Sequence, residues 1–363
     1  MSERPLTIFV TADPELPVPP VLYGGIERVV AQLVDGLAAR GHRVVLFAHA
    51  HSATAGELVA YPSRRSRGAA ATATHAALLA REYLRRRPAV IHSFDRLAYL
   101  SPLLPAPVPK VMSYQRAITR SRVVWAHRAS RGTLTFTGCS RRLIAPVTDV
   151  GRWRVLYNSV PVERYPFRAS VSADAPLVFL GRIESIKGPH LAIDIARRAG
   201  RRLVIAGNVE PAHQAFFDTA IAPHVDGTAV QFVGPVDDAA KAVLLGGAAA
   251  LLMPLLWDEP FGIVMAEALA CGTPVIGLAR GAVPEVVADR QTGFVCETVD
   301  DMVSRAGALD TVRREDCRRA AEVRFSTTAL VDACVAIYGE MMARGATAVP
   351  SDVATHSAGG PVP

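Results

Sequence analysis

The chain has 363 residues, half of them hydrophobic and a fifth charged, which predicts two globular domains and excludes a mainly disordered protein. Its net charge of +7 comes almost wholly from arginine, and no nucleic-acid-binding module accompanies that charge, so we expect no nucleic-acid partner. No apolar run reaches the roughly 20 residues that span a bilayer, and the first residues lack the features of a signal peptide, so a cytoplasmic protein is expected.

Predicted strands and helices alternate along the first half of the chain. Residues 6–10 are typical of a strand, and the pair Gly24-Gly25 directly precedes a helical pattern. In that pattern, apolar residues from Ile26 to Leu37 recur at the spacing of one helix face, and Gly41 is expected to end the helix. The further strands expected in this half are 43–48, 89–94, 109–114 and 134–137.

The second half repeats the same unit of strand, glycine-bearing loop, helix and strand. A strand is expected at 177–180, followed by a helix over 191–199 and a strand at 203–206. The aliphatic run 250–256 predicts a buried parallel strand, and 274–277 predicts the next one. Two such sets predict two doubly wound parallel sheets, with the boundary between them in the polar, proline-bearing stretch 161–176.

A pair of glutamates stands between the last two of these strands. Glu259 lies just before a predicted helix and Glu267 lies inside it, with Pro260 suited to a first helical position. Gly262 lets backbone approach a ligand closely, and free N–H groups at such a helix start attract phosphate. Because ligands bind at strand-to-helix loops of parallel sheets, this turn predicts a nucleotide-sugar site.

The spacing of Glu259 and Glu267 resembles the E-x7-E motif of retaining glycosyltransferases of family 4. Gly181-Arg182 followed by Lys187-Gly188 resembles the G-R-x4-K-G signature of that family, and Gly24-Gly25 resembles its N-terminal glycine loop. Residues 231–236 are similar to the strand end that frames the nucleotide base, and 281–286 to the loop after the E-x7-E helix. These motifs follow the family order and cover most of residues 176–296.

The resemblance implies the GT-B fold, an α/β architecture of two Rossmann-like, doubly wound domains that face a central cleft. The N-terminal, acceptor-binding domain is expected over residues 1–165 and the nucleotide-sugar donor domain over 166–326. A C-terminal helix at 327–345 is expected to cross back to the first domain. The Gly-, Ala- and Ser-rich residues 346–363 predict a disordered tail.

The resemblance also implies roles for individual residues. The residues expected to act in catalysis are Glu259, Arg182, Lys187 and Gln115. Those expected to bind the donor are Gly24, Gly25, Arg182, Lys187, Pro235, Val236, Glu259, Phe261, Gly262, Ile263 and Glu267. Arg182 and Lys187 would neutralise the diphosphate, Glu259 would bind sugar hydroxyls, and Glu267 would bind the ribose.

Two departures from the family pattern stand out. The linker entrance reads Asn158-Ser159-Val160-Pro161 where family members often carry Asn-Gly-Val-Asp, so a different hinge turn is expected. Many members have a histidine that contacts the transferred sugar after the strand at 108–114, and here that position is Gln115. A neutral amide can bond a hydroxyl but cannot titrate, which leaves open whether Gln115 replaces that histidine.

The resulting functional hypothesis is a retaining glycosyltransferase that moves a hexose from a nucleotide-diphosphate sugar, UDP-glucose or a similar donor. The acceptor would be a small molecule or a lipid, joined through an α-linkage. The alternatives are a nucleotide-sugar epimerase of the same fold and a non-catalytic nucleotide-sugar-binding subunit. A dinucleotide oxidoreductase is disfavoured because Gly24-Gly25 is not part of a G-x-G-x-x-G pattern.

The cysteines and basic residues add further expectations. The five cysteines lack any metal-ligand spacing, so they are expected to be reduced packing residues, with no metal site and no cofactor besides the co-substrate. Arginines gather in the first half at 64–67, 85–87 and 116–131. They predict a solvated basic surface, and the alternative is a peripheral contact with an acidic membrane at its inner face or with a phosphorylated acceptor.

Overall fold

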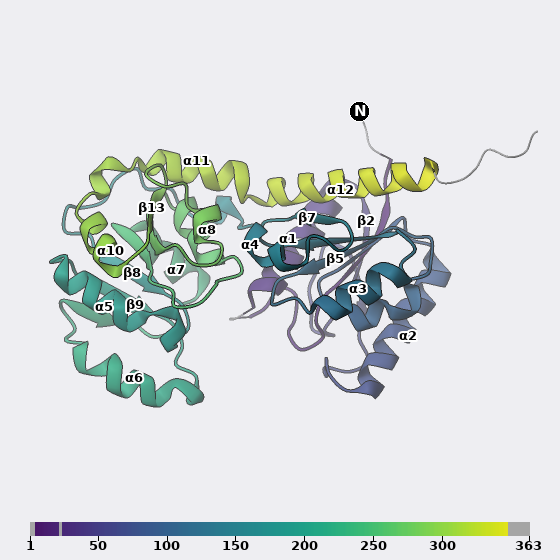
Figure 1. Ribbon diagram of the computed structural model, residues 1–363, viewed down its shortest axis with the longest axis horizontal. Coiled ribbons are helices and arrows are strands. Elements are labelled where there is room, and N and C mark those ends of the chain that lie inside the picture. Colours follow the sequence, from purple (N-terminus) through teal and green to yellow (C-terminus); the bar gives the residue numbers. More distant parts are fainter. Residues whose placement is uncertain (1–3, 22–23, 348–363) are drawn as a thin grey trace, which may run out of the picture.

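The computed structural model describes residues 4–21 and 24–347, with side chains up to residue 344. Within this part, the chain forms two lobes that lie side by side and are joined by a long helix (Figure 1). Each lobe is built on its own parallel sheet with helices on its faces. Two parallel α/β domains of this kind confirm the predicted fold class.

The N-terminal lobe contains a sheet that, in the described residues, has seven strands in the order β3-β2-β1-β4-β5-β6-β7, all paired in parallel. The strands are β1 (Thr7–Thr11), β2 (Arg43–Ala48), β3 (Glu57–Ala60), β4 (Val90–Ser93), β5 (Lys110–Tyr114), β6 (Leu134–Gly138) and β7 (Trp153–Val155). The main helices are α1 (Gly25–Ala39), α2 (Ala69–Arg86), α3 (Arg120–Ala129) and α4 (Arg141–Ile144). The apolar stripe predicted from Ile26 to Leu37 lies on α1, where Val29, Val30 and Leu33 are buried.

The C-terminal lobe contains a second sheet, whose described strands follow the order β10-β9-β8-β11-β12-β13. The strands are β8 (Leu177–Leu180), β9 (Leu203–Ala206), β10 (Val230–Phe232), β11 (Ala250–Met253), β12 (Val275–Leu278) and β13 (Gly293–Cys296). The helices are α5 (Pro189–Arg198), α6 (Gln214–Ala220), α7 (Asp238–Gly246), α8 (Ile263–Ala270), α9 (Val283–Val286), α10 (Val299–Ala306) and α11 (Arg314–Arg324). Because β8 and β11 are central and parallel, the loops after both strands open at one edge of the sheet.

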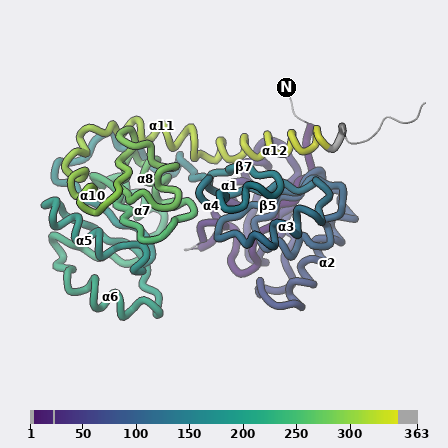
Figure 2. Tube along the Cα trace, viewed as in Figure 1, coloured from purple at the N-terminus to yellow at the C-terminus, as the bar shows by residue number. Residues whose placement is uncertain are grey.

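Helix α12 (Thr327–Thr347) leaves the C-terminal lobe and runs along the N-terminal lobe (Figure 2). It packs on α1 so closely that a Cβ on Gly36 would lie 2.5 Å from Val331 Cγ2. Its Tyr338 is buried and bonds His92 Nδ1 of β4 through a 2.6 Å contact. The second half of the chain therefore contributes to the core of the first. The tail predicted at 346–363 lies outside the described residues, except for 346–347 at the end of α12.

Some predicted elements need correction. The strand predicted over 250–256 ends at Met253, because the next residue, Pro254, has no N–H to donate to a neighbouring strand. The strands β3, β7 and β13 were not predicted. All three are short edge strands, and the side chains of β3 and β7 are half exposed, which weakens the alternation of apolar and polar residues. No helix in the described part of the chain is long and apolar enough to cross a membrane.

Candidate active site

A cleft of about 610 Å³ lies between the two lobes and is lined by both. The C-terminal lobe contributes the end of β8, with Arg182 and Lys187 beyond it, and the loop that carries Glu259 into α8. The N-terminal lobe contributes the start of α1 and Gln115, which directly follows β5. Of the predicted site residues, the lining includes Gly24, Gly25, Gln115, Arg182, Lys187, Glu259, Phe261, Gly262, Ile263 and Glu267.

Two helix starts from opposite lobes meet in this cleft. Helices α1 and α8 begin after Gly24 and Gly262, and neither of these glycines has a side chain that could cap its helix. They lie so close that a Cβ on Gly25 would be 3.0 Å from Ile263 Cδ1. Gly262 has a φ of 74°, a left-handed conformation that suits glycine. The backbone N–H groups of two first turns therefore gather where an anion could bind.

Glu259 and Lys187 form an ion pair in the cleft wall. The Lys187 Nζ atom donates to Glu259 Oε2 at 2.5 Å and lies 4.4 Å from the centre of the Trp257 ring. Their side chains are 16% and 13% exposed, so the pair is shielded yet still reachable from the cleft. Arg182 at the end of β8 is paired with Glu184 at 2.6 Å. Two cations and a carboxylate thus converge beside the start of α8.

Glu267 lies one turn into α8 and is held by two neighbours. Its Oε1 accepts a 2.8 Å hydrogen bond from the Tyr165 hydroxyl and an ion pair from Lys241 of α7. Lys241 also pairs with Asp238 at 3.1 Å, and Asp238 in turn pairs with Arg28 of the other lobe. Lys241 was not predicted as a site residue; its only signal in the sequence is that it is one of three lysines, beside Lys187 and Lys110.

The positions of three predicted residues, Pro235, Val236 and Pro260, need comment. Pro235 and Val236 lie between β10 and α7 and are not part of the cleft lining, so their role in donor binding stays a prediction. Pro260 is not a first helical residue, because α8 begins at Ile263. Instead, the Pro260 carbonyl accepts a hydrogen bond from the thiol of Cys139 at 3.4 Å. A contact from the other lobe therefore fixes this loop, which no local pattern can reveal.

A second cavity, of about 760 Å³, opens in the N-terminal lobe. It shares part of its lining with the cleft, including Glu27, Gln115 and Arg116, so the two cavities are neighbours. Its other polar side chains come from the segments after β1, β3, β4 and β5 and from α3. The polar part of the lining is carboxylate, guanidinium and hydroxyl, and it stands beside apolar side chains that include Phe94, Leu97 and Met112, with Trp125 half exposed at α3. Gln115 stands between the two cavities.

Asp95 is the most perturbed carboxylate of this second cavity. Burial raises its pKa to about 7, against the hydrogen bonds that Ser93 and Tyr61 donate to it at 2.7 and 2.8 Å. Burial also raises the pKa values of Asp13 and Glu27 in the same cavity. These carboxyl groups can therefore keep a proton at a higher pH than exposed ones.

Asp95 should make stability depend on pH. Its pKa is higher in the folded protein than the 3.8 of a free side chain, so its contribution is complete below about pH 4 and is lost as the pH rises through about 7. In the wild type, the unfolding free energy should therefore decrease between about pH 4 and pH 7. In Asp95→Asn this decrease should be smaller by on the order of a few kcal/mol. Urea unfolding at pH 4, 5.5 and 7 measures this, and parallel curves for the variant and the wild type would contradict it.

The five cysteines are buried, and one group of side chains in the described residues has the spacing of metal ligands. Cys139, Cys271, Cys296, Cys317 and Cys334 are all buried and free, as predicted for packing cysteines. Burial raises the pKa of each thiol to between about 11 and 12.

Among the described residues, Glu184, Glu210 and His213 have ligand atoms within 4.8 Å of one another. Arg182 pairs with both of these glutamates, so its cation already balances one of their two negative charges.

The arginine clusters of the first half divide between two environments. Arg85 and Arg86 pair with Glu82, whose pKa is lowered to about 2 because hydrogen bonds from Arg86, Arg85 and Arg81 outweigh its burial. Arg67, Arg116 and Arg122 instead line the second cavity, together with Arg96. Part of the predicted basic surface is therefore neutralised within the protein and part of it faces the second cavity. A peripheral membrane contact stays a prediction.

The two facing Rossmann-like domains, the interdomain cleft and the crossing C-terminal helix define the GT-B fold. Two family models match almost consecutively, Glycosyltransferase Family 4 over residues 23–164 and Glycosyl transferases group 1 over residues 167–322. The chain belongs to the group 1 glycosyltransferases.

Individual relatives agree with this assignment. The chain is 28% identical to a glycogen synthase of Mycobacterium tuberculosis over 86% of its own length and 89% of the relative's. It is 33% identical to a D-inositol 3-phosphate glycosyltransferase of Mycobacteroides abscessus over 47% of its own length and 41% of the relative's. Among solved structures, AviGT4, a glycosyltransferase involved in avilamycin A biosynthesis, matches with a TM-score of 0.72 and 26% identity, covering 94% of this chain and 99% of that one.

Proposed function

We propose that the protein is a retaining glycosyltransferase that transfers a hexose from a nucleotide-diphosphate sugar, UDP-glucose or a similar donor, with an α-linkage. The observation that carries the proposal is that two helix starts with glycine at the N-cap lie in one cleft with Arg182, Lys187 and Glu259. A diphosphate leaving group needs this concentration of positive charge.

Each donor-binding group has a distinct task. Arg182 and Lys187 neutralise the charge that grows on the diphosphate as the sugar–phosphate bond breaks, and the amides at the start of α8 add to that effect. When Lys187 binds phosphate, the Glu259 carboxylate is available to sugar hydroxyls and to the positive charge that develops near the anomeric carbon. Glu267, held in place by Lys241 and Tyr165, bonds the ribose hydroxyls.

The acceptor is a polyhydroxylated molecule in the second cavity rather than a lipid. Carboxylates, guanidinium groups and hydroxyls such as Asp95, Arg96 and Ser101 line that cavity, and they bond hydroxyl groups well. Its volume is in the range of about 300–1,000 Å³ that is typical of small-molecule sites. The names of two relatives point the same way, because glycogen and D-inositol 3-phosphate are both polyhydroxylated.

One assay tests the donor, the acceptor class and the stereochemistry. The protein is incubated with radiolabelled UDP-glucose and a cell extract, and the label is then partitioned between water and an organic solvent. We expect transferred label in the aqueous saccharide fraction and, by NMR of the purified product, an α-linkage. A β-linked product would contradict retention, label in the organic phase would contradict the acceptor class, and an altered nucleotide sugar formed without acceptor would indicate an epimerase.

Activity is expected to survive chelation of metal ions. Arg182, Lys187 and the helix starts can supply the charge that a divalent ion would otherwise bring to the diphosphate. Turnover in excess EDTA should therefore stay close to its untreated value. Complete loss of turnover that Mg²⁺ or Mn²⁺ restores would overturn this expectation and direct attention to Glu184, Glu210 and His213.

Gln115 is expected to act on the transferred sugar rather than on the nucleotide. It stands between the donor cleft and the acceptor cavity, and it can supply one neutral hydrogen bond of about 0.5–1.5 kcal/mol. Gln115→Ala should lower kcat several-fold and leave the UDP affinity unchanged. Gln291→Ala, which removes an exposed glutamine outside both cavities, is the matched control. Wild-type kinetics in Gln115→Ala would mean that the residue is only loop surface.

A further inference from the structure

Glu285 of the C-terminal lobe reaches across to the N-terminal lobe. It lies on the short helix α9, and its two carboxylate oxygens accept hydrogen bonds from the backbone N–H groups of Arg141 and Arg142, both at 2.7 Å. The Tyr157 hydroxyl in the linker donates a third bond at 3.3 Å. Charge-assisted bonds to backbone amides are short and directional. The carboxylate therefore fastens α9 to the first residues of α4.

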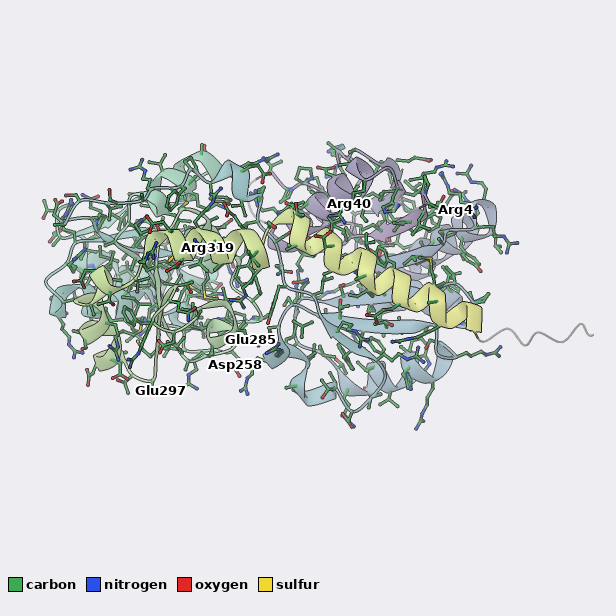
Figure 3. The ribbon with its side chains drawn as sticks, turned by 90° about the horizontal axis from the view of Figure 1, so that it is seen from above. Arg4, Arg40, Asp258, Glu285, Glu297 and Arg319 are labelled. Atoms are coloured by element: carbon green, nitrogen blue, oxygen red, sulfur yellow. The ribbon has the colours of Figure 1, made fainter. Side chains whose placement is uncertain are left out.

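The same segment of the N-terminal lobe also touches the loop that carries Glu259. Arg142 donates to Asp258 at 2.9 Å, and the Cys139 thiol donates to the Pro260 carbonyl at 3.4 Å. These contacts lie on either side of Glu259 in the sequence. Asp258 and Glu285 lie close together at the boundary between the two lobes (Figure 3). Residues 139–142 thus dock against both α9 and the Glu259 loop.

Within the C-terminal lobe, the segment before α9 is locked to the backbone of Glu259. The Ala282 N–H donates to the Glu259 carbonyl at 2.9 Å, and the Gly281 N–H donates to the Asp258 carboxylate at 2.9 Å. Gly281 has a φ of 55°, and a Cβ there would lie 2.2 and 2.3 Å from the backbone N and O of Glu259. Because the two backbones are in contact, a displacement of α9 displaces Glu259.

We infer that Glu285 is a positioning residue, which sets Glu259 in its working position only when residues 139–142 of the N-terminal lobe dock against it. The inference rests on the proposed function, since Glu259 is taken to act on the donor sugar. Donor binding by Arg182, Lys187 and Glu267 involves other atoms of the C-terminal lobe. Loss of the Glu285 contact should therefore affect turnover much more than nucleotide affinity.

The kinetic test compares Glu285→Ala with two controls. Glu297→Ala removes an exposed glutamate of the same lobe, and Arg141→Ala removes an exposed side chain of the docked segment while its backbone N–H, which bonds Glu285, remains. We expect Glu285→Ala to lower kcat by about tenfold or more, with the UDP dissociation constant within about twofold of the wild type. Both controls should stay within about threefold of the wild type, and Glu285→Gln should fall between.

A kcat in Glu285→Ala equal to that of the controls would overturn the inference. An equal loss of turnover and UDP affinity would also overturn it, because it would indicate general damage to the lobe.

Small-angle X-ray scattering of the free protein separates this inference from the proposed function, because it needs no activity. The radius of gyration of Glu285→Ala should exceed that of the wild type, while that of Glu297→Ala should not. An unchanged radius in Glu285→Ala would overturn the docking role, whatever the reaction is. If the wild type shows no turnover with any nucleotide sugar, the proposed function fails, and the scattering result still decides whether Glu285 holds the lobes together.

Discussion

Lys187→Ala is expected to lower kcat by about 10²–10³, the effect of removing one preorganised donor from a charge-stabilising site. Lys187 stands in the cleft wall with only 16% of its side chain exposed, so water screens its charge weakly. Its ammonium group would meet the leaving diphosphate when the negative charge there is largest. Steady-state kinetics with saturating UDP-glucose measures the change.

The variant also removes the partner of Glu259, so its folding has to be checked. Lys187→Met keeps most of the side-chain volume beside Trp257 and removes only the charge. It should lose as much activity as Lys187→Ala while melting closer to the wild-type temperature. Lys187→Arg, which keeps a cation of different shape, should recover part of the rate. A Lys187→Met enzyme within a few-fold of wild-type turnover would remove Lys187 from the reaction.

The sequence was most informative at the donor half of the site. Arg182, Lys187 and Glu259 follow strands β8 and β11, which are neighbours in a parallel sheet, so their loops meet at one edge. Strand-to-helix connections of this kind have clear local signals: an aliphatic run, a glycine and then a helical pattern. The order of these local motifs along the chain was therefore enough to predict the sheet and the cleft.

Contacts between distant segments left no such signal. Lys241 reaches Glu267 across 26 positions, and Glu285 reaches Arg141 across 144, so neither pair shares a local pattern. The second cavity is likewise assembled from Asp13 and Asp95 on separate loops and Glu27 on α1. These partners are set by the tertiary fold, in which α12 and residues 139–142 bring the two lobes together.

Glu267→Ala is expected to weaken UDP binding at least about tenfold. Two vicinal ribose hydroxyls can bond one carboxylate, and charge-assisted hydrogen bonds contribute roughly 1.5–3 kcal/mol each, where about 1.4 kcal/mol corresponds to a factor of ten. The carboxylate is already oriented by Tyr165 and Lys241, so little ordering is needed when the ligand binds. Isothermal titration calorimetry with UDP measures the change directly.

The structure offers a matched control for this change. Tyr165→Phe removes the hydroxyl that bonds Glu267 Oε1 but keeps the carboxylate and its ion pair with Lys241, so UDP affinity should fall by less than about fivefold. In Glu267→Ala, Lys241 still has Asp238 at 3.1 Å, so no cation is left buried alone and the fold should persist. Unchanged UDP affinity in a folded Glu267→Ala protein would exclude this carboxylate from the nucleotide site. In that case the ion pair with Lys241 would serve only to join α7 to α8.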